Sequence, residues 1–525
     1  MSSGTDPVIA EVSDPATGST RATAESGATP SRWSTPALTV VCVAAYVAVQ
    51  FRYLRPPMTE DAMTYIEAAT AFPDLANDHW SLRIGLLLPL RVLLEAFGPS
   101  EVAYYAIPVA AGAALAGSTF LVGAALFGRS VGIASVIVLV SSNWFLSYSS
   151  ALLPDHVAAA LVTTAAAVML STRPSSRRAG LALLCIGGLL GWAYLVREFT
   201  LLLFPPAYLF IRSQFGASGV RRAALPVVVV FVAELVLNTA IHRNPLARWF
   251  VAGGHDEVVD RIEAPGSRLD AITRFPDAVF GGAGTFGIGL LLVLSLFSCV
   301  VLGRHRAFLC GWIGAYLVPL TLASGLVSPD LKLFRSQLLR YWTPVLPAII
   351  VGGLGVLAVV ARAICEAGGL RPRAAVRVGG VVVLLIAVFA AVRADEGVAA
   401  ADIYERNGAT QLDELRAWLV TEGADVEVLW TDSQTARVMP LVVRSAAGEL
   451  LWDGEVRAFN SAEDPLAFAP PASFEPGQVI VFYPFGYLGR IDSWSAIPAH
   501  IRQLQPGWES VLQRRDDTLL IYRIG

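Results

Sequence analysis

The sequence predicts a mainly α-helical, polytopic transmembrane bundle of about eleven spans, followed by a small α/β region. Of the 525 residues, 55% are hydrophobic and only 15% are charged, whereas a soluble protein of this size carries about 25% charged residues. The apolar residues fall in long runs, and most of these approach the roughly 20 residues that a helix needs to cross a bilayer. The net charge is −3, without a basic run, so nothing indicates a nucleic-acid partner.

Eleven apolar segments form the predicted spans of a transmembrane domain over residues 34–394. The preceding residues, 1–33, are rich in Ser, Thr, Ala, Gly and Pro and lack the apolar core of a signal peptide. We therefore expect a disordered cytoplasmic tail there. The predicted spans cover residues 36–54, 101–127, 131–149, 156–172, 179–196, 199–213, 223–241, 283–303, 307–325, 341–361 and 378–394.

One further apolar segment, residues 83–97, decides the orientation of every later span. It is short and charged, and Arg83, Leu87 and Arg91 share one helical face, which favours a helix lying in the membrane interface. If it does not cross, the arginine-rich loops all lie inside, as the positive-inside rule requires. We therefore expect a multi-pass protein of the cell membrane with a cytoplasmic N-terminus. The loops concerned contain Arg129, Arg177, Arg221, Arg304 and Arg371.

The C-terminal region, residues 395–525, is polar enough to form a globular domain outside the membrane. Short apolar runs predict strands, and amphipathic stretches predict helices. We therefore expect a small extracytoplasmic α/β domain, in which no catalytic motif is recognisable. The predicted strands are Val426–Trp430, Val479–Tyr483 and Leu519–Ile524, and the predicted helices are Ala409–Val420 and Ser495–Leu504.

Two adjacent carboxylates, Glu60 and Asp61, follow the first span and are the first candidate site residues. Charges at a membrane surface are costly unless they are solvated or used. Asp61 and Tyr65 are four residues apart, so a helix places both on one face. The structural alternative is that Thr59 caps this helix, with the two acids favoured by the helix dipole.

Other polar residues gather at the same predicted outer ends of the spans. Asp155 lies in the turn before a long helix and could be its N-cap. For His156 beside it, a helix-start residue facing the headgroups is a better explanation than a base. Arg197 is followed by Glu198 at a break between two apolar segments, where a structural ion pair is the simpler explanation. His79 and Arg83 flank Trp80, which we expect to anchor at the membrane interface.

A late outer loop carries three cations, Lys332, Arg335 and Arg340, against the positive-inside bias. Snorkelling to lipid headgroups would explain them. A bound lipid phosphate is the sharper interpretation, because arginine offers a fork of donors to phosphate oxygens and lysine a point charge. The loop ends in Arg340-Tyr341-Trp342-Thr343-Pro344-Val345-Leu346-Pro347, which opens a span.

The order of these features resembles that of the GT-C glycosyltransferases, of the type that includes protein O-mannosyltransferases and lipid A aminoarabinose transferases. The resemblance covers about residues 36–394 and rests on the acid pair with Tyr65, on Asp155 and on the motif after Arg340. It implies a sugar donor linked to polyprenyl phosphate, and transfer on the outer face to a glycan, lipid or protein of the cell envelope.

The resemblance also implies roles for the candidate residues. Asp61 would be the catalytic base, with Glu60 as the alternative because the familiar pair reads Asp-Glu, and Asp155 would be a second acid. A carboxylate can take the proton of an attacking hydroxyl, and cations can stabilise the charge on a departing phosphate. The donor phosphate would lie near Arg340, Tyr341, Lys332 and Arg335. The cavity would be lined by Tyr65, His79, Arg83, His156 and Arg197.

Three further interpretations stay open at the level of the sequence. A lipid or glycan transporter or flippase would also have many spans, although such proteins tend to place ionisable residues in mid-span. A non-catalytic assembly or sensor protein would depend on residues 395–525 instead. Asp61 and Asp155 could also share a divalent cation, but two carboxylates are too few to predict a metal site.

Overall fold

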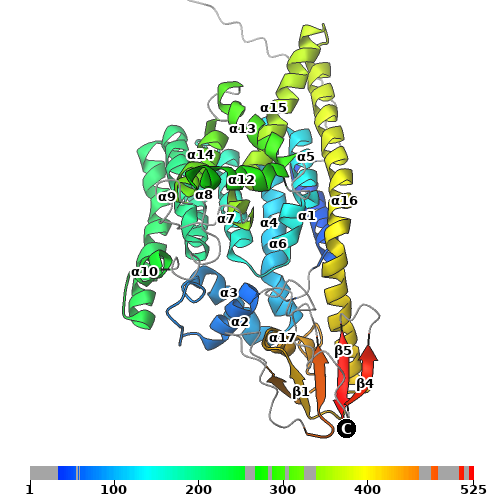
Figure 1. Cartoon of the computed structure of the whole chain (residues 1–525). Helices are drawn as coiled ribbons and strands as arrows, with labels where there is room; N and C mark the ends of the chain where they lie inside the picture. The colour runs from blue at the N-terminus through cyan, green and yellow to red at the C-terminus, as the bar shows by residue number, and fades with distance from the viewer. Residues whose placement is uncertain are drawn as a thin grey trace, which may run out of the picture.

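The computed structural model describes residues 34–54, 57, 60–254, 267–281, 287–301, 307–323, 339–459, 475–482, 508–513 and 519–525. Long helices form a bundle, and a small sheet lies at one end of it (Figure 1). The helices are α1 (Thr35–Arg52), α2 (Glu60–Ala71), α3 (Ile84–Phe97), α4 (Glu101–Phe127), α5 (Arg129–Ser141), α6 (Asn143–Ser149), α7 (Pro154–Ser171), α8 (Ala179–Val196), η1 (Glu198–Leu203), α9 (Phe204–His242), α10 (Ala247–Gly254), α12 (Arg268–Gly281), α13 (Ile288–Val301), α14 (Ala307–Thr321), η4 (Leu339–Val345), α15 (Leu346–Ala367), α16 (Pro372–Val420) and α17 (Ser433–Val442).

The predicted polytopic helical fold is confirmed. Among the described residues, seven helices have the length and apolarity to cross a membrane. The 45-residue stretch Glu198–His242 holds two of the predicted segments, separated at Gly216, whose positive φ of 67° breaks the helix and is easily adopted by glycine. Three more predicted segments form shorter apolar helices, Arg129–Ser141, Ile288–Ser298 and Ala307–Thr321.

Helix α3 contains the segment that decides the predicted orientation. Its 14 residues reach about 21 Å, which is too short for a hydrocarbon core of about 30 Å. Together with α2 it lies at the end of the bundle that faces the sheet (Figure 1), as an interfacial helix should. Which side of the membrane this end occupies stays a prediction.

Within the described residues, the sheet has five strands in the order β2-β1-β3-β5-β4. Strand β1 pairs in parallel with β2 and β3, whereas β5 is antiparallel to both β3 and β4. The predictions of β1, β3 and β5 are confirmed; β2 and β4 were not predicted, because their polar residues hide the apolar signal of a strand. The predicted helix 495–504 lies outside the described residues. The strands are β1 (Val428–Thr431), β2 (Glu455–Ala458), β3 (Val479–Phe482), β4 (Trp508–Gln513) and β5 (Leu520–Ile524).

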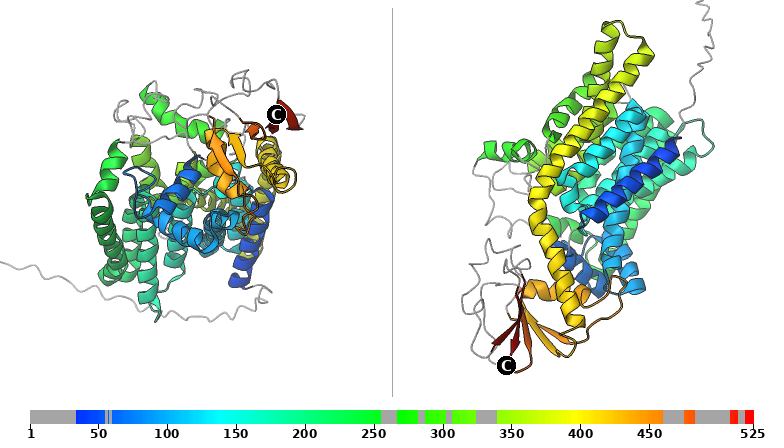
Figure 2. Two further views of the ribbon diagram at one scale, coloured as in Figure 1. Left: turned by 90° about the horizontal axis from the view of Figure 1, so that it is seen from below. Right: turned by 90° about the vertical axis from the view of Figure 1, so that its right-hand side faces the viewer.

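Helix α16 joins the bundle to the sheet without a linker. It runs from Pro372 to Val420 and therefore continues through residues 394 and 395, where the sequence suggested a division between domains. In the right-hand view of Figure 2 it is a long helix that leads along the bundle to the sheet. The predicted helix Ala409–Val420 forms its last turns.

Helix α2 is held between the bundle and the sheet domain. Its apolar face, including Met63 and Tyr65, shares one buried cluster with residues of α3, α16 and the sheet. On its other side, Arg437 of α17 forms an ion pair of 2.7 Å with Glu67 and donates to the hydroxyl of Thr64 at 2.8 Å. Helix α2, which carries Asp61, is thus held in place by contacts with both the bundle and the sheet domain.

Candidate active site

Asp61 lies in the first turn of α2 and is bound by side chains from two other segments. The indole Nε1 of Trp80 donates to its Oδ1 at 3.1 Å, and Arg340 Nη1 lies 2.8 Å from its Oδ2. Burial alone would raise the pKa of this carboxyl, but Arg340, the Trp80 hydrogen bond and Arg83 together hold the pKa below its usual value. Asp61 is therefore an ionised carboxylate at neutral pH.

Tyr65, one turn after Asp61, is completely buried. Arg83 donates from Nη1 to its hydroxyl, and the Arg83 Cζ lies 5.6 Å from the centre of its ring. Burial raises the pKa of the Tyr65 hydroxyl, so it stays protonated. Arg83 itself is half-buried and, within the described part of the chain, has no carboxylate at ion-pairing distance.

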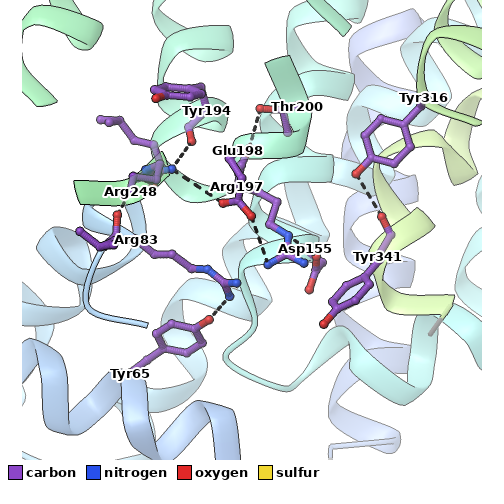
Figure 3. Close-up of polar contacts among 12 residues, drawn as sticks. Tyr65, Arg83, Asp155, Tyr194, Arg197, Glu198, Thr200, Arg248, Tyr316 and Tyr341 are labelled. Atoms are coloured by element: carbon purple, nitrogen blue, oxygen red, sulfur yellow. Dashed lines mark hydrogen bonds and ion pairs between the residues drawn. The ribbon is translucent and has the colours of Figure 1, made fainter. Parts of the chain in front are cut away.

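Asp155 and Arg197 form a second pair deeper in the same end of the bundle (Figure 3). The Nε of Arg197 lies 3.1 Å from the Oδ1 of Asp155, and the two side chains are only 4% and 2% exposed. The structure contradicts the cap explanation for Asp155, because α7 has Leu153 as its N-cap and no side-chain cap bond. Its carboxylate turns to Arg197 instead, because a buried guanidinium needs a counter-charge.

The structural ion pair expected between Arg197 and Glu198 is the weaker of the two contacts. These groups approach only to 4.0 Å, whereas the Asp155 contact is shorter by almost 1 Å. Arg197 also lies with its Cζ 4.6 Å from the ring centre of Tyr341. It therefore connects Asp155 to the segment that carries Arg340.

The beginning of η4 brings Arg340 to Asp61 of α2. Arg340 reaches Asp61, and its Cζ lies 5.2 Å from the ring centre of Tyr341. The backbone there is held by Tyr316, whose hydroxyl donates to the carbonyl of Tyr341 at 3.1 Å, and by Thr343, which donates to the carbonyl of Arg340 at 2.7 Å. Lys332 and Arg335 lie outside the described residues.

Seven of the predicted site residues therefore meet in one cluster: Asp61, Tyr65, Arg83, Asp155, Arg197, Arg340 and Tyr341. His79 lies beside it, with its ring centre 3.6 Å from that of Trp80. The backbone of Glu60 begins α2, but its side chain lies outside the described part of the chain.

His156 lies in the first turn of α7, as expected, but the expectation that it faces the lipid headgroups is wrong. The side chain is completely buried and its ring lies 5.1 Å from that of Phe145, centre to centre, so it does not face lipid headgroups. It comes directly after Asp155 on α7, and successive helical residues point about 100° apart. The His156 side chain therefore packs against Phe145 in the interior and not against Arg197.

Two partners of the site were not predicted. Trp80 was expected to be an interface anchor, whereas its indole binds Asp61. Arg248 of α10, in a long loop without a motif, is 4% exposed and has its Nε 2.6 Å from Glu234. Glu234 was the sequence feature that could have revealed Arg248, because a carboxylate within an apolar span needs a buried cation nearby.

The described residues contain no group of three or more His, Cys, Asp and Glu side chains that could hold a metal ion. Asp61 and Asp155 each have a guanidinium as their partner instead. The geometry therefore adds no support for a divalent cation shared by the two acids.

Comparison with known proteins identifies the fold. No family model and no curated protein matches the chain. The structure of ArnT from Cupriavidus metallidurans in the apo state matches over 92% of this chain and 97% of that chain, with 17% identity and a TM-score of 0.54. The same protein bound to undecaprenyl phosphate matches over the same shares, with 17% identity and a TM-score of 0.51. The oligosaccharyltransferase of Archaeoglobus fulgidus in the apo form is less similar, at 12% identity and a TM-score of 0.48, over 80% of this chain and 65% of that chain.

The likeness to ArnT extends over nearly the whole of both chains. At 17% identity it establishes a common fold and leaves the activity to be argued from the site. The polytopic helical architecture expected from the sequence is thus shared with ArnT.

Proposed function

We propose that this chain is an integral membrane glycosyltransferase, which transfers a sugar from a polyprenyl-phosphate donor to an extracytoplasmic acceptor of the cell envelope. One observation carries the proposal: Asp61, from the first loop, and Arg340, from the last, meet at 2.8 Å. A carboxylate that can accept the proton of the acceptor and a cation that can stabilise the leaving phosphate thus lie side by side. They do so in the fold of ArnT, one structure of which holds undecaprenyl phosphate.

Asp61 is the proposed base. As the acceptor hydroxyl attacks C1 of the sugar, its proton passes to the Asp61 carboxylate. The bond between C1 and the phosphate oxygen breaks, and its electron pair leaves with the polyprenyl phosphate. Arg340 can bind either Asp61 or a phosphate oxygen, so a bound donor draws it away and makes Asp61 a stronger base. Glu60, its neighbour, is the alternative base.

Arg83 and Arg340 are the proposed ligands of the donor phosphate. Arg83 suits this role because no described carboxylate lies at ion-pairing distance from it, while the Tyr65 hydroxyl holds it in place. Lys332, Arg335 and Tyr341 complete the proposed donor end of the site. The proposed role of Asp155 is indirect. It neutralises the buried Arg197 and so keeps that cation beside Tyr341.

We expect Arg83→Gln to weaken binding of polyprenyl phosphate by about 10- to 100-fold, the value of one charge-assisted hydrogen bond. Titration of the lipid into the purified protein in nanodiscs measures this affinity. Arg362→Gln is the matched control, because Arg362 pairs with Glu366 on an exposed face of α15. An unchanged affinity in Arg83→Gln would remove Arg83 from the donor site.

The function itself is tested with the purified protein and a panel of labelled polyprenyl-phosphate sugars. We expect time-dependent release of polyprenyl phosphate from one of these donors when an envelope extract supplies the acceptor. Lipid that moves between leaflets without cleavage of any donor would instead support a flippase. The same panel identifies the sugar, and the labelled product identifies the acceptor.

A further inference from the structure

We propose that Arg248 is a positioning residue, which sets the spacing between the two segments that carry Arg83 and Arg197. This inference rests on the proposed function, because it takes these two arginines as parts of the site. Arg248 lies on α10 and touches neither Asp61 nor Tyr65 in the contacts of the described residues. It therefore acts through the backbone that carries other site residues.

The guanidinium of Arg248 binds three backbone carbonyls from two segments. Its Nη2 donates to Leu82 at 2.6 Å and to Leu195 at 2.9 Å, and its Nη1 donates to Tyr194 at 2.8 Å. The carbonyls of Tyr194 and Leu195 belong to the last turn of α8, where helix carbonyls lack intrahelical partners. Leu82 lies just before α3. One side chain thus joins the start of α3 to the end of α8. Figure 3 shows Arg248 beside Tyr194.

The two segments are in direct backbone contact at this junction. A Cβ atom on Gly85 would come within 2.8 Å of the Cβ of Leu195 and of the backbone nitrogen of Val196. Trp192 of α8 also donates from Nε1 to the carbonyl of Gly85 at 2.9 Å. The junction therefore has no intervening side chain to absorb a shift, and a change in the Arg248 contacts moves one backbone against the other.

Each segment delivers one arginine to the site. Arg83 directly follows Leu82 and donates to Tyr65 on α2. Arg197 follows the end of α8 and pairs with Asp155 on α7. The distance between these two cations therefore depends on the junction that Arg248 holds.

Two acids neutralise Arg248 and keep it in place. Glu234 of α9 lies 2.6 Å from its Nε, and Glu198 lies 3.9 Å from its Nη1. Glu198 is shared with Arg197, which couples the two guanidinium groups electrostatically. The charge is thus balanced within a nearly dry environment, as a buried arginine requires.

A lysine cannot reproduce this arrangement. Its ammonium group is a point charge on a flexible stem, whereas the planar guanidinium presents five donors in a rigid fork. Arg248→Lys therefore keeps the charge opposite Glu234 and Glu198 but cannot hold all three carbonyls in the same geometry. This substitution separates positioning from charge.

The test is a double-mutant cycle on affinity for polyprenyl phosphate, measured with the full-length protein in nanodiscs. We expect Arg248→Lys to weaken binding by about tenfold in the native background, and to have little further effect in the Arg83→Gln background. Such non-additivity shows that Arg248 acts through Arg83. Full additivity, or native affinity in Arg248→Lys, would overturn the inference.

Arg416→Lys is the matched control. Arg416 also binds two carbonyls, those of Leu441 and Val442, and an acid, Glu101, but it does so beside the sheet. We expect its effect on affinity to be small and to add to that of Arg83→Gln. A non-additive term in the Arg248 cycle, and none in the Arg416 cycle, excludes a general loss of stability as the cause.

A second variant keeps the test decisive if Arg248→Lys does not fold. Trp192→Phe removes the hydrogen bond to Gly85 at the same junction while keeping an aromatic ring there, and it should give a smaller, again non-additive, loss of affinity. Native affinity in that variant would overturn the inference. If the unmodified protein binds no polyprenyl phosphate, the proposed function fails instead, so the two failures are distinguishable.

Discussion

Asp61→Asn is expected to lower the rate of sugar transfer by roughly 10²–10⁴-fold, the usual contribution of a general base. Asparagine keeps the shape of the side chain and an oxygen that can accept the hydrogen bond from Trp80, but it cannot take a proton. The variant should therefore fold. Its affinity for polyprenyl phosphate should be retained, because Arg340 loses its competing partner. Turnover at saturating donor, measured beside thermal unfolding, checks both parts.

Glu60→Gln is the internal control, because Glu60 is the acid next to Asp61 in the chain. Native turnover in this variant is expected. Full activity in Asp61→Asn together with a loss in Glu60→Gln would assign the role of base to Glu60. Native activity in both would leave the transferase without a base and favour the transporter.

The lowered pKa of Asp61 also predicts how activity depends on pH. The base is the ionised form, so kcat/KM, which reports the free enzyme, should fall only as the pH drops through the depressed pKa of this carboxyl. This fall in kcat/KM should therefore occur at a pH below the usual pKa of a carboxyl group. Stability follows the same sign, because a depressed folded-state pKa contributes stability above the unfolded-state value that is lost on acidification.

Arg197→Met is expected to lower the free energy of unfolding by about 3–5 kcal/mol, because it leaves a buried charge without its partner. The carboxylate of Asp155 is only 2% exposed and has little water to replace the guanidinium. The double variant Asp155→Asn/Arg197→Met should recover much of this loss, since it removes both charges. Unfolding in an SDS titration measures the three free energies.

The comparison is with an exposed pair of the same chemistry. Arg362 and Glu366 lie one helical turn apart on α15, with side chains 49% and 35% exposed. Arg362→Met should change the free energy of unfolding by no more than about 0.5 kcal/mol. An equally small effect for Arg197→Met would mean that water reaches Asp155 in the membrane-embedded protein.

The helical bundle was predictable because its signals are local. A run of apolar residues long enough for a bilayer is visible in the sequence alone, and so is the spacing that places Asp61 and Tyr65 on one face of α2. Strands β1, β3 and β5 were likewise visible as apolar runs. Strand β2, Glu455–Ala458, was not, because its residues read as polar and it is completed only by pairing with β1.

The sequence also indicated which residues to suspect, since a charge near an apolar span is costly without a use. It did not indicate their partners. Asp155 was open to a capping role, and Arg197 to a pair with Glu198, because both explanations use only neighbours in the chain. The structure pairs Asp155 with Arg197 across two helices instead.

By itself, the sequence of this protein indicated where the long apolar helices lie, and it placed Asp61, Asp155, Arg197 and Arg340 near the ends of predicted spans. Only the tertiary structure decided that Asp61 binds Arg340, and that Arg248 joins the start of α3 to the end of α8. The physical reason is that periodicity and burial cost act within a segment. The partner of a buried charge is instead set by how helices distant in the chain pack together, and no single segment carries that information.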